Sequence, residues 1–157
     1  MVNNMINLNY KKSRIPLSNN ELNYLFEILE TYAKSKNGSW MNEISYKDVS
    51  YYWSSSLNLD NGILGIRPVF KNEIYLMTNL NNTSNEMLIK SWIKLIAATT
   101  IHELFHMYQQ QKYGKLLWMI MKIPEVIPCL YGKVFIEKEA IKIENEATEF
   151  INNNFKW

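Results

Sequence analysis

IHELFHMYQQQ, residues 101–111, contains both histidines of this 157-residue chain. His102 and His106 are four residues apart, and Glu103 directly follows the first of them. In an α-helix four residues turn through about 400°, so both imidazoles project from nearly the same side, one turn apart. Glu103 lies about 100° around the helix from His102. The spacing therefore predicts a helix that presents two imidazoles together, with a carboxylate beside them.

The surrounding sequence predicts a long helix that contains this stretch. Thr83 and Glu86 form a capping box, in which the two side chains satisfy free backbone N–H groups at the start of a helix. Apolar residues then recur at helical spacing, and Gly114 is typical of a helix end. The recurring residues are Met87, Leu88, Trp92, Ile96, Leu104 and Tyr108. Ile101 and Phe105 flank the histidines, so we expect this part of the helix to be buried.

Two imidazoles placed in this way can chelate one tetrahedral metal ion, with Zn–N distances of about 2.0–2.1 Å. Glu103 would lie beside the ion, where it can accept a proton from metal-bound water. This is the HExxH pattern of zinc proteases, although a pattern with three defined positions also arises by chance. A catalytic zinc has three protein ligands and one open position. The chain has no third histidine and only one cysteine, so a carboxylate has to be the third ligand.

VFIEKEAIKIENEATEFINNNF, residues 134–155, predicts a last helix that carries candidate carboxylates. Its apolar stripe consists of Ile136, Ala140, Ile143, Ala147 and Phe150. Its acidic residues are Glu137, Glu139, Glu144, Glu146 and Glu149. Lysines are interleaved with them, so most of these glutamates form a solvated face and at most one is a ligand. Glu137 and Glu139 both lie about 80° from the centre of the stripe, and helix geometry does not decide between them.

The rest of the chain predicts one more helix and a small sheet. PLSNNELNYLFEILETYAKSKNG, residues 16–38, begins with a capping box of Ser18 and Glu21 and ends at a stop signal, Asn37-Gly38. Residues 40–77 are rich in β-branched and aromatic residues and predict two to four antiparallel strands. We therefore expect an α+β fold with a small antiparallel sheet, in a single domain of residues 1–157.

Composition excludes several classes of function. Seventeen basic and fifteen acidic residues leave a net charge of +2, too little to predict a nucleic-acid or membrane surface. The single cysteine cannot form an internal disulfide. The N-terminus lacks the apolar core of a signal peptide, and prolines and charges interrupt the most apolar segment, residues 116–130. We expect a cytoplasmic protein without nucleic-acid or membrane partners; its oligomeric state is left open.

HELFHMYQQ followed about thirty residues later by FIEKEA resembles the gluzincin group of zinc metallopeptidases. In that group a glutamate near the start of a later helix is the third ligand. Lethal-factor-type, membrane-type and ImmA/IrrE-like proteases resemble E-x-x-A-[D/E/N] there, which assigns Glu137, because Ala140 is three residues later. Thermolysin-like enzymes place the alanine directly after the ligand, which would assign Glu139. Ile141 stands where those families have an acidic or amide residue that orients a ligand histidine.

The resemblance implies a zincin-like fold and a zinc-dependent peptidase with a peptide or protein substrate. Zn²⁺ would be held by His102, His106 and Glu137, and Glu103 would be the general base on the zinc-bound water. Tyr131 is the candidate oxyanion donor, because lethal-factor-type enzymes resemble this chain in having a tyrosine shortly before the ligand helix. Arg67 is a second candidate. If Glu137 is the ligand, we expect Glu139 to behave as an ordinary surface residue.

Zincins also resemble one another in binding an extended substrate along an antiparallel edge strand above the metal. KNEIYLMTNL, residues 71–80, occupies that place in the order of elements. Alternation predicts that Ile74 and Leu76 face the core, whereas Tyr75 and Met77 face the other way.

Two other classes of protein remain compatible with the motifs. The chain could be a catalytically silent zinc-containing binding or regulatory protein on the same fold, since function rests on the site and not on the fold. It could also be a metal-free helical domain whose HExxH is accidental. A measurement of zinc content tests the second of these alternatives, and a peptidase assay with Glu103→Gln as control tests the first.

Overall fold

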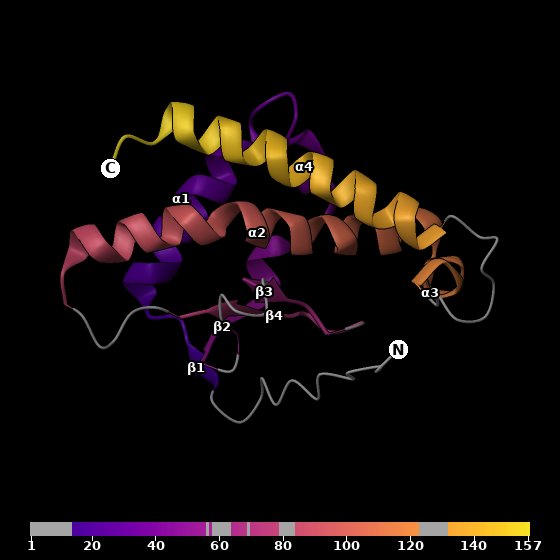
Figure 1. Cartoon of the computed structure of the whole chain (residues 1–157), viewed down its shortest axis with the longest axis horizontal. Coiled ribbons are helices and arrows are strands. Elements are labelled where there is room, and N and C mark those ends of the chain that lie inside the picture. Colours follow the sequence, from indigo (N-terminus) through magenta and orange to yellow (C-terminus); the bar gives the residue numbers. More distant parts are fainter. Residues whose placement is uncertain (1–13, 56, 58–63, 69, 79–83, 123–131) are drawn as a thin grey trace, which may run out of the picture.

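The computed structural model describes residues 14–55, 57, 64–68, 70–78, 84–122 and 132–157. Within these residues the fold is α+β, with four α-helices and one four-stranded sheet. Helix α2 (Glu86–Tyr113) runs between the sheet and α4 (Gly132–Asn154) (Figure 1). The other helices are α1 (Asn19–Ala33), α3 (Lys115–Lys122) and the short 3-10 helices η1 (Ser39–Glu43) and η2 (Tyr46–Asp48).

The sheet is mixed, so the expected antiparallel arrangement is wrong at one pairing. Its strands are β1 (Arg14–Pro16), β2 (Ser50–Ser54), β3 (Gly65–Ile66) and β4 (Glu73–Met77), in the order β1-β2-β4-β3. Strands β2 and β4 are parallel, whereas β1 pairs antiparallel with β2 and β3 pairs antiparallel with β4. Parallel neighbours need a connection of a dozen or more residues, and residues 55–72 between β2 and β4 are long enough.

Strand β4 is central, so the expectation that residues 71–80 form the edge strand is wrong. It pairs with β2 on one side and with β3 on the other, which leaves β3 as the edge of the sheet on this side. The predicted alternation is confirmed. Ile74 and Leu76 belong to the main core, while Tyr75 and Met77 belong to a second, smaller cluster on the opposite face of the sheet.

The helix ends follow local capping chemistry, with one correction. The capping box of Ser18 and Glu21 at the start of α1 is confirmed. At the start of α2 the N-cap is Asn85, whose side chain accepts hydrogen bonds from the backbone N–H groups of Met87 and Leu88. The capping box predicted from Thr83 and Glu86 is therefore wrong, and Thr83 itself lies outside the described residues. Helix α2 ends before Gly114, whose φ of 78° favours glycine.

Residues 39–48, at the start of the segment for which two to four strands are predicted, form the two 3-10 helices η1 and η2. Trp40 in η1 is buried, and its ring meets the ring of Phe105 on α2 edge-on, with centroids 5.0 Å apart. The aromatic content of this segment thus serves packing against α2 rather than strand pairing.

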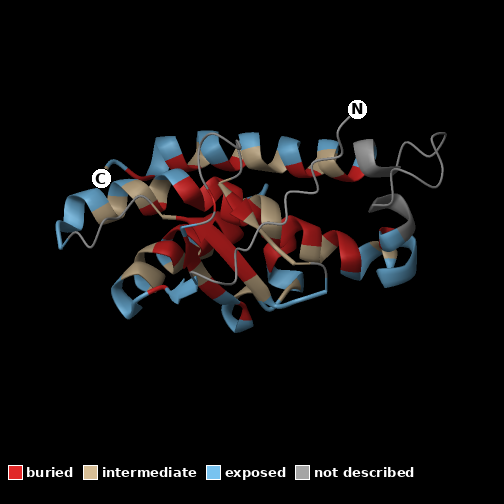
Figure 2. Cartoon of the chain, turned by 60° about the horizontal axis from the view of Figure 1, so that its bottom comes forward, coloured by how far each residue is buried: buried red, intermediate tan, exposed pale blue. Residues whose placement is uncertain are grey.

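The core lies where the helices meet the sheet, and it determines how α4 is oriented. Figure 2 shows buried residues concentrated between the helices and the sheet. Helix α4 buries a single stripe, formed by Ile136, Ala140, Ala147 and Ile151, and it contacts α2. Beside this stripe, Glu137 and Glu144 are seven residues apart, so they project in nearly the same direction, two turns apart. Among the described residues, no helix combines the length and the apolar character that crossing a bilayer requires.

Candidate metal centre

The packing of α4 on α2 brings a carboxylate to the two histidines. His102 and His106 on α2 and Glu137 on α4 form a group whose ligand atoms all lie within 4.8 Å of one another, and this group could hold a metal ion. The two imidazole Nε2 atoms are 3.1 Å apart. The Glu137 oxygens lie 3.6 Å from the Nε2 of His102 and 3.6 Å from that of His106. Glu139 is not part of this group.

These spacings fit a tetrahedral ion. Ligand atoms that are each about 2.0–2.2 Å from a tetrahedral zinc are about 3.3–3.6 Å from one another. The two Nε2 atoms are 3.1 Å apart, and each lies 3.6 Å from a different oxygen of Glu137, Oε2 for His102 and Oε1 for His106. A modest rotation of the Glu137 carboxylate would bring one oxygen within ligand spacing of both imidazoles. Two imidazole nitrogens and one carboxylate are also a donor set that zinc uses in catalytic sites. The distances do not identify the metal.

The orientation of His102 is determined by Glu144 on α4. The Nδ1 of His102 lies 2.9 Å from Glu144 Oε2, and the other oxygen of that carboxylate accepts a hydrogen bond from the Thr99 hydroxyl at 3.1 Å. Because an ionised carboxylate only accepts, Nδ1 has to be the protonated nitrogen of His102. Its Nε2 lone pair is thereby directed towards Glu137 and His106.

His106 is oriented by an amide instead. Gln109 is fully buried, and its Nε2 donates to the Ile136 carbonyl at 3.0 Å and to Glu139 Oε2 at 3.1 Å. The amide oxygen must therefore be the atom that lies 2.8 Å from His106 Nδ1. An amide oxygen only accepts, so His106 is also protonated at Nδ1 and directs its Nε2 lone pair into the group. Glu139 in turn accepts a second hydrogen bond from the Tyr113 hydroxyl at 3.2 Å.

Two converging lone pairs and a carboxylate create a site that favours a cation. In the metal-free protein a proton can take that role. Burial by itself lowers the pKa of His102, but hydrogen bonds to Glu137 and Glu144 outweigh it and raise the pKa to about 9. The same contact with His102 lowers the pKa of Glu144 below its usual value. A metal ion and a proton thus compete for the same nitrogen of His102.

The group borders a cavity of about 350 Å³ that Glu103 also lines. Leu64 and Gly65, at the edge strand β3, form part of its wall. Gly65 is required there, because a Cβ atom at this position would lie 2.9 Å from the Thr99 methyl group on α2. The close approach of β3 to α2 places the edge strand on the same cavity as Glu103 and two of the candidate ligands, His102 and Glu137.

Of the two candidate oxyanion donors, Tyr131 and Arg67, the structure describes only Arg67. Tyr131 lies outside the described residues. Arg67 directly follows β3, and its Nη2 donates to Gln110 Oε1 at 3.1 Å. Burial lowers the pKa of Arg67, and the negative charge of Glu103 opposes this shift. Arg67 is thus on the Glu103 side of α2.

Sequence reasoning missed three residues that support the histidines. Glu144 orients His102 from three residues beyond Ile141, where the resemblance offers no polar group, and Ile141 is half exposed. Gln109 and Glu139 support His106, so the expectation that Glu139 is an ordinary surface residue is wrong. One signal was available: Glu144 follows Glu137 by seven residues, which is two helical turns.

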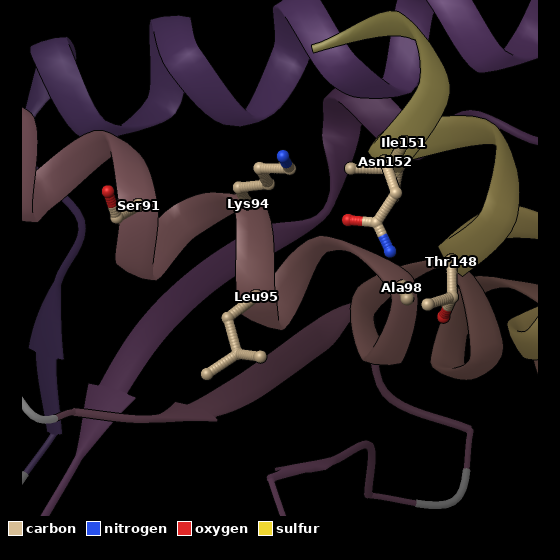
Figure 3. Close-up of a pocket in the computed structure, with 7 residues that line it drawn as sticks. All are labelled: Ser91, Lys94, Leu95, Ala98, Thr148, Ile151 and Asn152. Carbon is tan, nitrogen blue, oxygen red and sulfur yellow. The ribbon is translucent and has the colours of Figure 1, made fainter. Parts of the chain in front are cut away.

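A second hollow, of about 180 Å³, lies between α2 and α4 away from the histidines. Figure 3 shows its lining residues, with Lys94 and Leu95 coming from α2 and Thr148 and Asn152 from α4. Lys94 is engaged, because it donates to the Phe155 carbonyl at 2.7 Å. The described lining residues include no histidine, cysteine or carboxylate, so they do not form a candidate metal site.

Comparison with protein-family models, with curated proteins and with solved structures finds no match to the chain. The functional interpretation therefore rests on the geometry of the site.

Proposed function

We propose that this protein is a zinc-dependent metallopeptidase that hydrolyses peptide bonds. His102, His106 and Glu137 hold the metal, and Glu103 is the general base. One observation carries the proposal: two Nε2 lone pairs, each directed by a hydrogen bond at Nδ1, converge with a carboxylate at spacings that suit a tetrahedral ion. Glu103 lines the same cavity, as the chemistry requires.

A zinc ion at this position supplies Lewis-acid activation of water and of the peptide carbonyl. Glu103 takes the proton from the attacking water and later passes it to the leaving amine. Glu144 and Gln109 keep the two imidazoles in the tautomer that leaves Nε2 free. Tyr131 is the candidate for stabilising the developing oxyanion.

The edge strand β3 gives an extended substrate a place to bind. Within the described part of the chain it pairs with β4 alone, and Gly65 lines the cavity of the candidate site. A peptide that adds to this edge by main-chain hydrogen bonds would run past Glu103. In this role β3 replaces residues 71–80, which form the central strand.

Zinc content and peptidase activity, measured together, test the proposal. Protein purified without chelator should contain close to one zinc per chain. It should cleave members of a random peptide library, with cleavage products identified by mass spectrometry. Glu103→Gln should keep its zinc and lose about 10²–10⁴-fold in cleavage rate, because glutamine cannot accept the proton. Glu149→Gln, which changes an exposed carboxylate on α4, is the matched control.

Each outcome has a distinct meaning. Zinc without cleavage of any library member would indicate the catalytically silent binding protein. Absence of metal after zinc supplementation would remove both zinc-dependent functions. Equal cleavage by the parent and by Glu103→Gln would show that another group is the base.

A further inference from the structure

A third cavity, of about 380 Å³, lies along α2 beyond the histidines. Met107 and Gln110 of α2 line it together with Arg67, Phe70 and Lys115. Of its lining residues that the structure describes, two are cationic and none is acidic. The cavity is therefore positively charged, in a chain whose net charge is only +2.

Among the residues that the structure describes, Arg67 has no ion-pair partner of the kind that a partly buried guanidinium normally has. Gln110 takes one of its five N–H groups, at 3.1 Å. Within the described part of the chain, Arg67 Nε has no hydrogen-bond partner and no carboxylate lies within 4.0 Å of the guanidinium. Burial lowers the pKa of Arg67, which means that its surroundings do not fully compensate the charge.

Gln110, which is hydrogen-bonded to Arg67, also has a buried N–H donor without a described acceptor. The residue is only 7% exposed, and its oxygen is occupied by Arg67. Its amide Nε2 has no hydrogen-bond partner among the residues that the structure describes. Buried donors without acceptors are rare and costly in proteins. Both unpartnered atoms are N–H donors, so the group that satisfies them must be an acceptor.

The cavity is close to the proposed reaction centre. Gln110 is one helical turn beyond His106, and Arg67 comes two residues after Gly65 on the edge strand. The charge of Glu103 acts on Arg67. A peptide that runs along β3 would carry a side chain into this cavity within about two residues of the scissile bond.

We infer that this cavity is a specificity subsite, in which Arg67 and Gln110 bind the carboxylate of an acidic substrate side chain. Arginine and a carboxylate form the charge-assisted, two-pronged contact that a guanidinium with free N–H groups favours. Lys115 at the cavity adds a second positive charge. The inference rests on the proposed peptidase function, because a specificity subsite serves a substrate. Peptide binding to this cavity can nevertheless be measured without cleavage.

The test compares two blocked pentapeptides, Ac-Ala-Ala-Glu-Ala-Ala-NH₂ and its uncharged glutamine counterpart. Both are titrated calorimetrically into the full chain with zinc supplied, in the Glu103→Gln background to prevent cleavage. We expect the glutamate peptide to bind about ten-fold more tightly, because a carboxylate satisfies donors that an amide satisfies less well.

Two arginine variants localise the effect. Arg67→Met keeps the apolar stem and should make the two peptides bind equally. Arg14→Met is the matched control: it removes the same charge from β1, at the opposite edge of the sheet, and should preserve the preference. These are the only two arginines in the chain.

A spectroscopic readout needs no arginine variant, in case Arg67→Met does not fold. The arginine Nε–H region of a ¹⁵N-correlated spectrum contains two side-chain signals. The glutamate peptide should shift the Arg67 signal and leave the Arg14 signal in place, and the glutamine peptide should shift neither. Equal binding of the two peptides, absence of binding at millimolar concentration, or a preference that survives Arg67→Met would overturn the inference. Cleavage that ignores acidic residues would overturn the subsite and leave the peptidase function intact.

Discussion

The two histidines of the candidate site are held in contrasting surroundings. His102 borders the cavity and is paired with an ionisable partner, Glu144, whose side chain is 31% exposed. His106 is buried, and its partner Gln109 is a neutral amide with no solvent exposure. The ring of Trp118 also lies next to His106, with centroids 6.3 Å apart. One imidazole is held by charge at the edge of a cavity and the other by a buried hydrogen-bond chain.

The site thus has two halves, His102 with Glu144 and His106 with Gln109, and we expect them to respond differently to pH. The His102 half responds to pH, because its carboxylates stabilise an imidazolium in the metal-free protein. The His106 half depends on geometry, since Gln109 has two acceptors for its amide N–H groups and can present only its oxygen to the ring. We expect substitutions in the two halves to be distinguishable by their pH dependence even where the loss of affinity is similar.

The largest effect should come from removing a metal ligand. We expect the same loss of zinc whether His102 or His106 is removed. His102→Ala and His106→Ala should each reduce zinc from near one per chain to none after dialysis, because two protein ligands do not form a stable site. Glu137→Ala should weaken zinc binding by at least about 100-fold. Elemental analysis and chelator competition measure both quantities. Full zinc occupancy in either histidine variant would exclude this centre.

The next largest effect should be that of pH on zinc affinity, and it should arise from His102. Zinc must displace the proton from a group whose pKa is about 9. Apparent affinity should therefore rise about ten-fold per pH unit well below this pKa, and about 50-fold from pH 7 to pH 9. Competition with a chelator of known pH dependence measures the slope. A flat profile would contradict the raised pKa of His102.

As pH rises, zinc affinity should increase, whereas the free energy of unfolding of the metal-free protein should decrease. The pKa of His102 is higher in the folded state, about 9, than its ordinary value of 6.5. A raised pKa contributes stability that is complete below pH 6.5 and is lost as pH rises through 9. Chemical denaturation of the apoprotein across this range should show the decline, and His102→Ala should abolish it.

Substitution of the supporting residues should separate the halves most clearly. Glu144→Gln and Gln109→Leu should each weaken zinc binding by about 10–100-fold, because each releases the orientation of one ligand. Glu144→Gln should also flatten the pH profile, while Gln109→Leu should leave its slope intact. Glu146→Gln, two residues further along α4 and on the opposite side of the helix from Glu144, is the control for a lost charge. Identical pH profiles in the two variants would refute the assignment of the charge effect to His102.

The smallest effect should be that of Glu139→Ala. It removes the acceptor for Gln109 and Tyr113, so we expect a loss of about 1–2 kcal/mol in the free energy of unfolding. Zinc affinity should fall by less than about ten-fold. An exposed substitution such as Glu149→Ala should stay within about ±0.5 kcal/mol. If Glu139→Ala lost its zinc and Glu137→Ala kept it, the thermolysin-like spacing would be the better guide to the third ligand.

Much of this protein was determined by short stretches of sequence. Helical periodicity, with a capping box at α1, predicted α1, α2 and α4 with ends within a few residues, because these signals act between residues three or four positions apart. The same locality explains why the spacing of His102 and His106 was informative: one turn of helix presents them together regardless of the rest of the fold. The choice of Glu137 over Glu139 came from a resemblance in spacing.

Only the tertiary structure decided which strand lies at the edge and which residues support the histidines. The parallel pairing of β2 with β4 and the position of β3 at the end of the strand order depend on long-range pairing, and no local pattern encodes that. Glu144 reaches His102 across 42 positions of sequence, and Glu139 reaches Gln109 across 30. Such contacts arise when α4 packs on α2 through its buried stripe. A side chain's role there depends on the partner helix, which its own sequence neighbours do not specify.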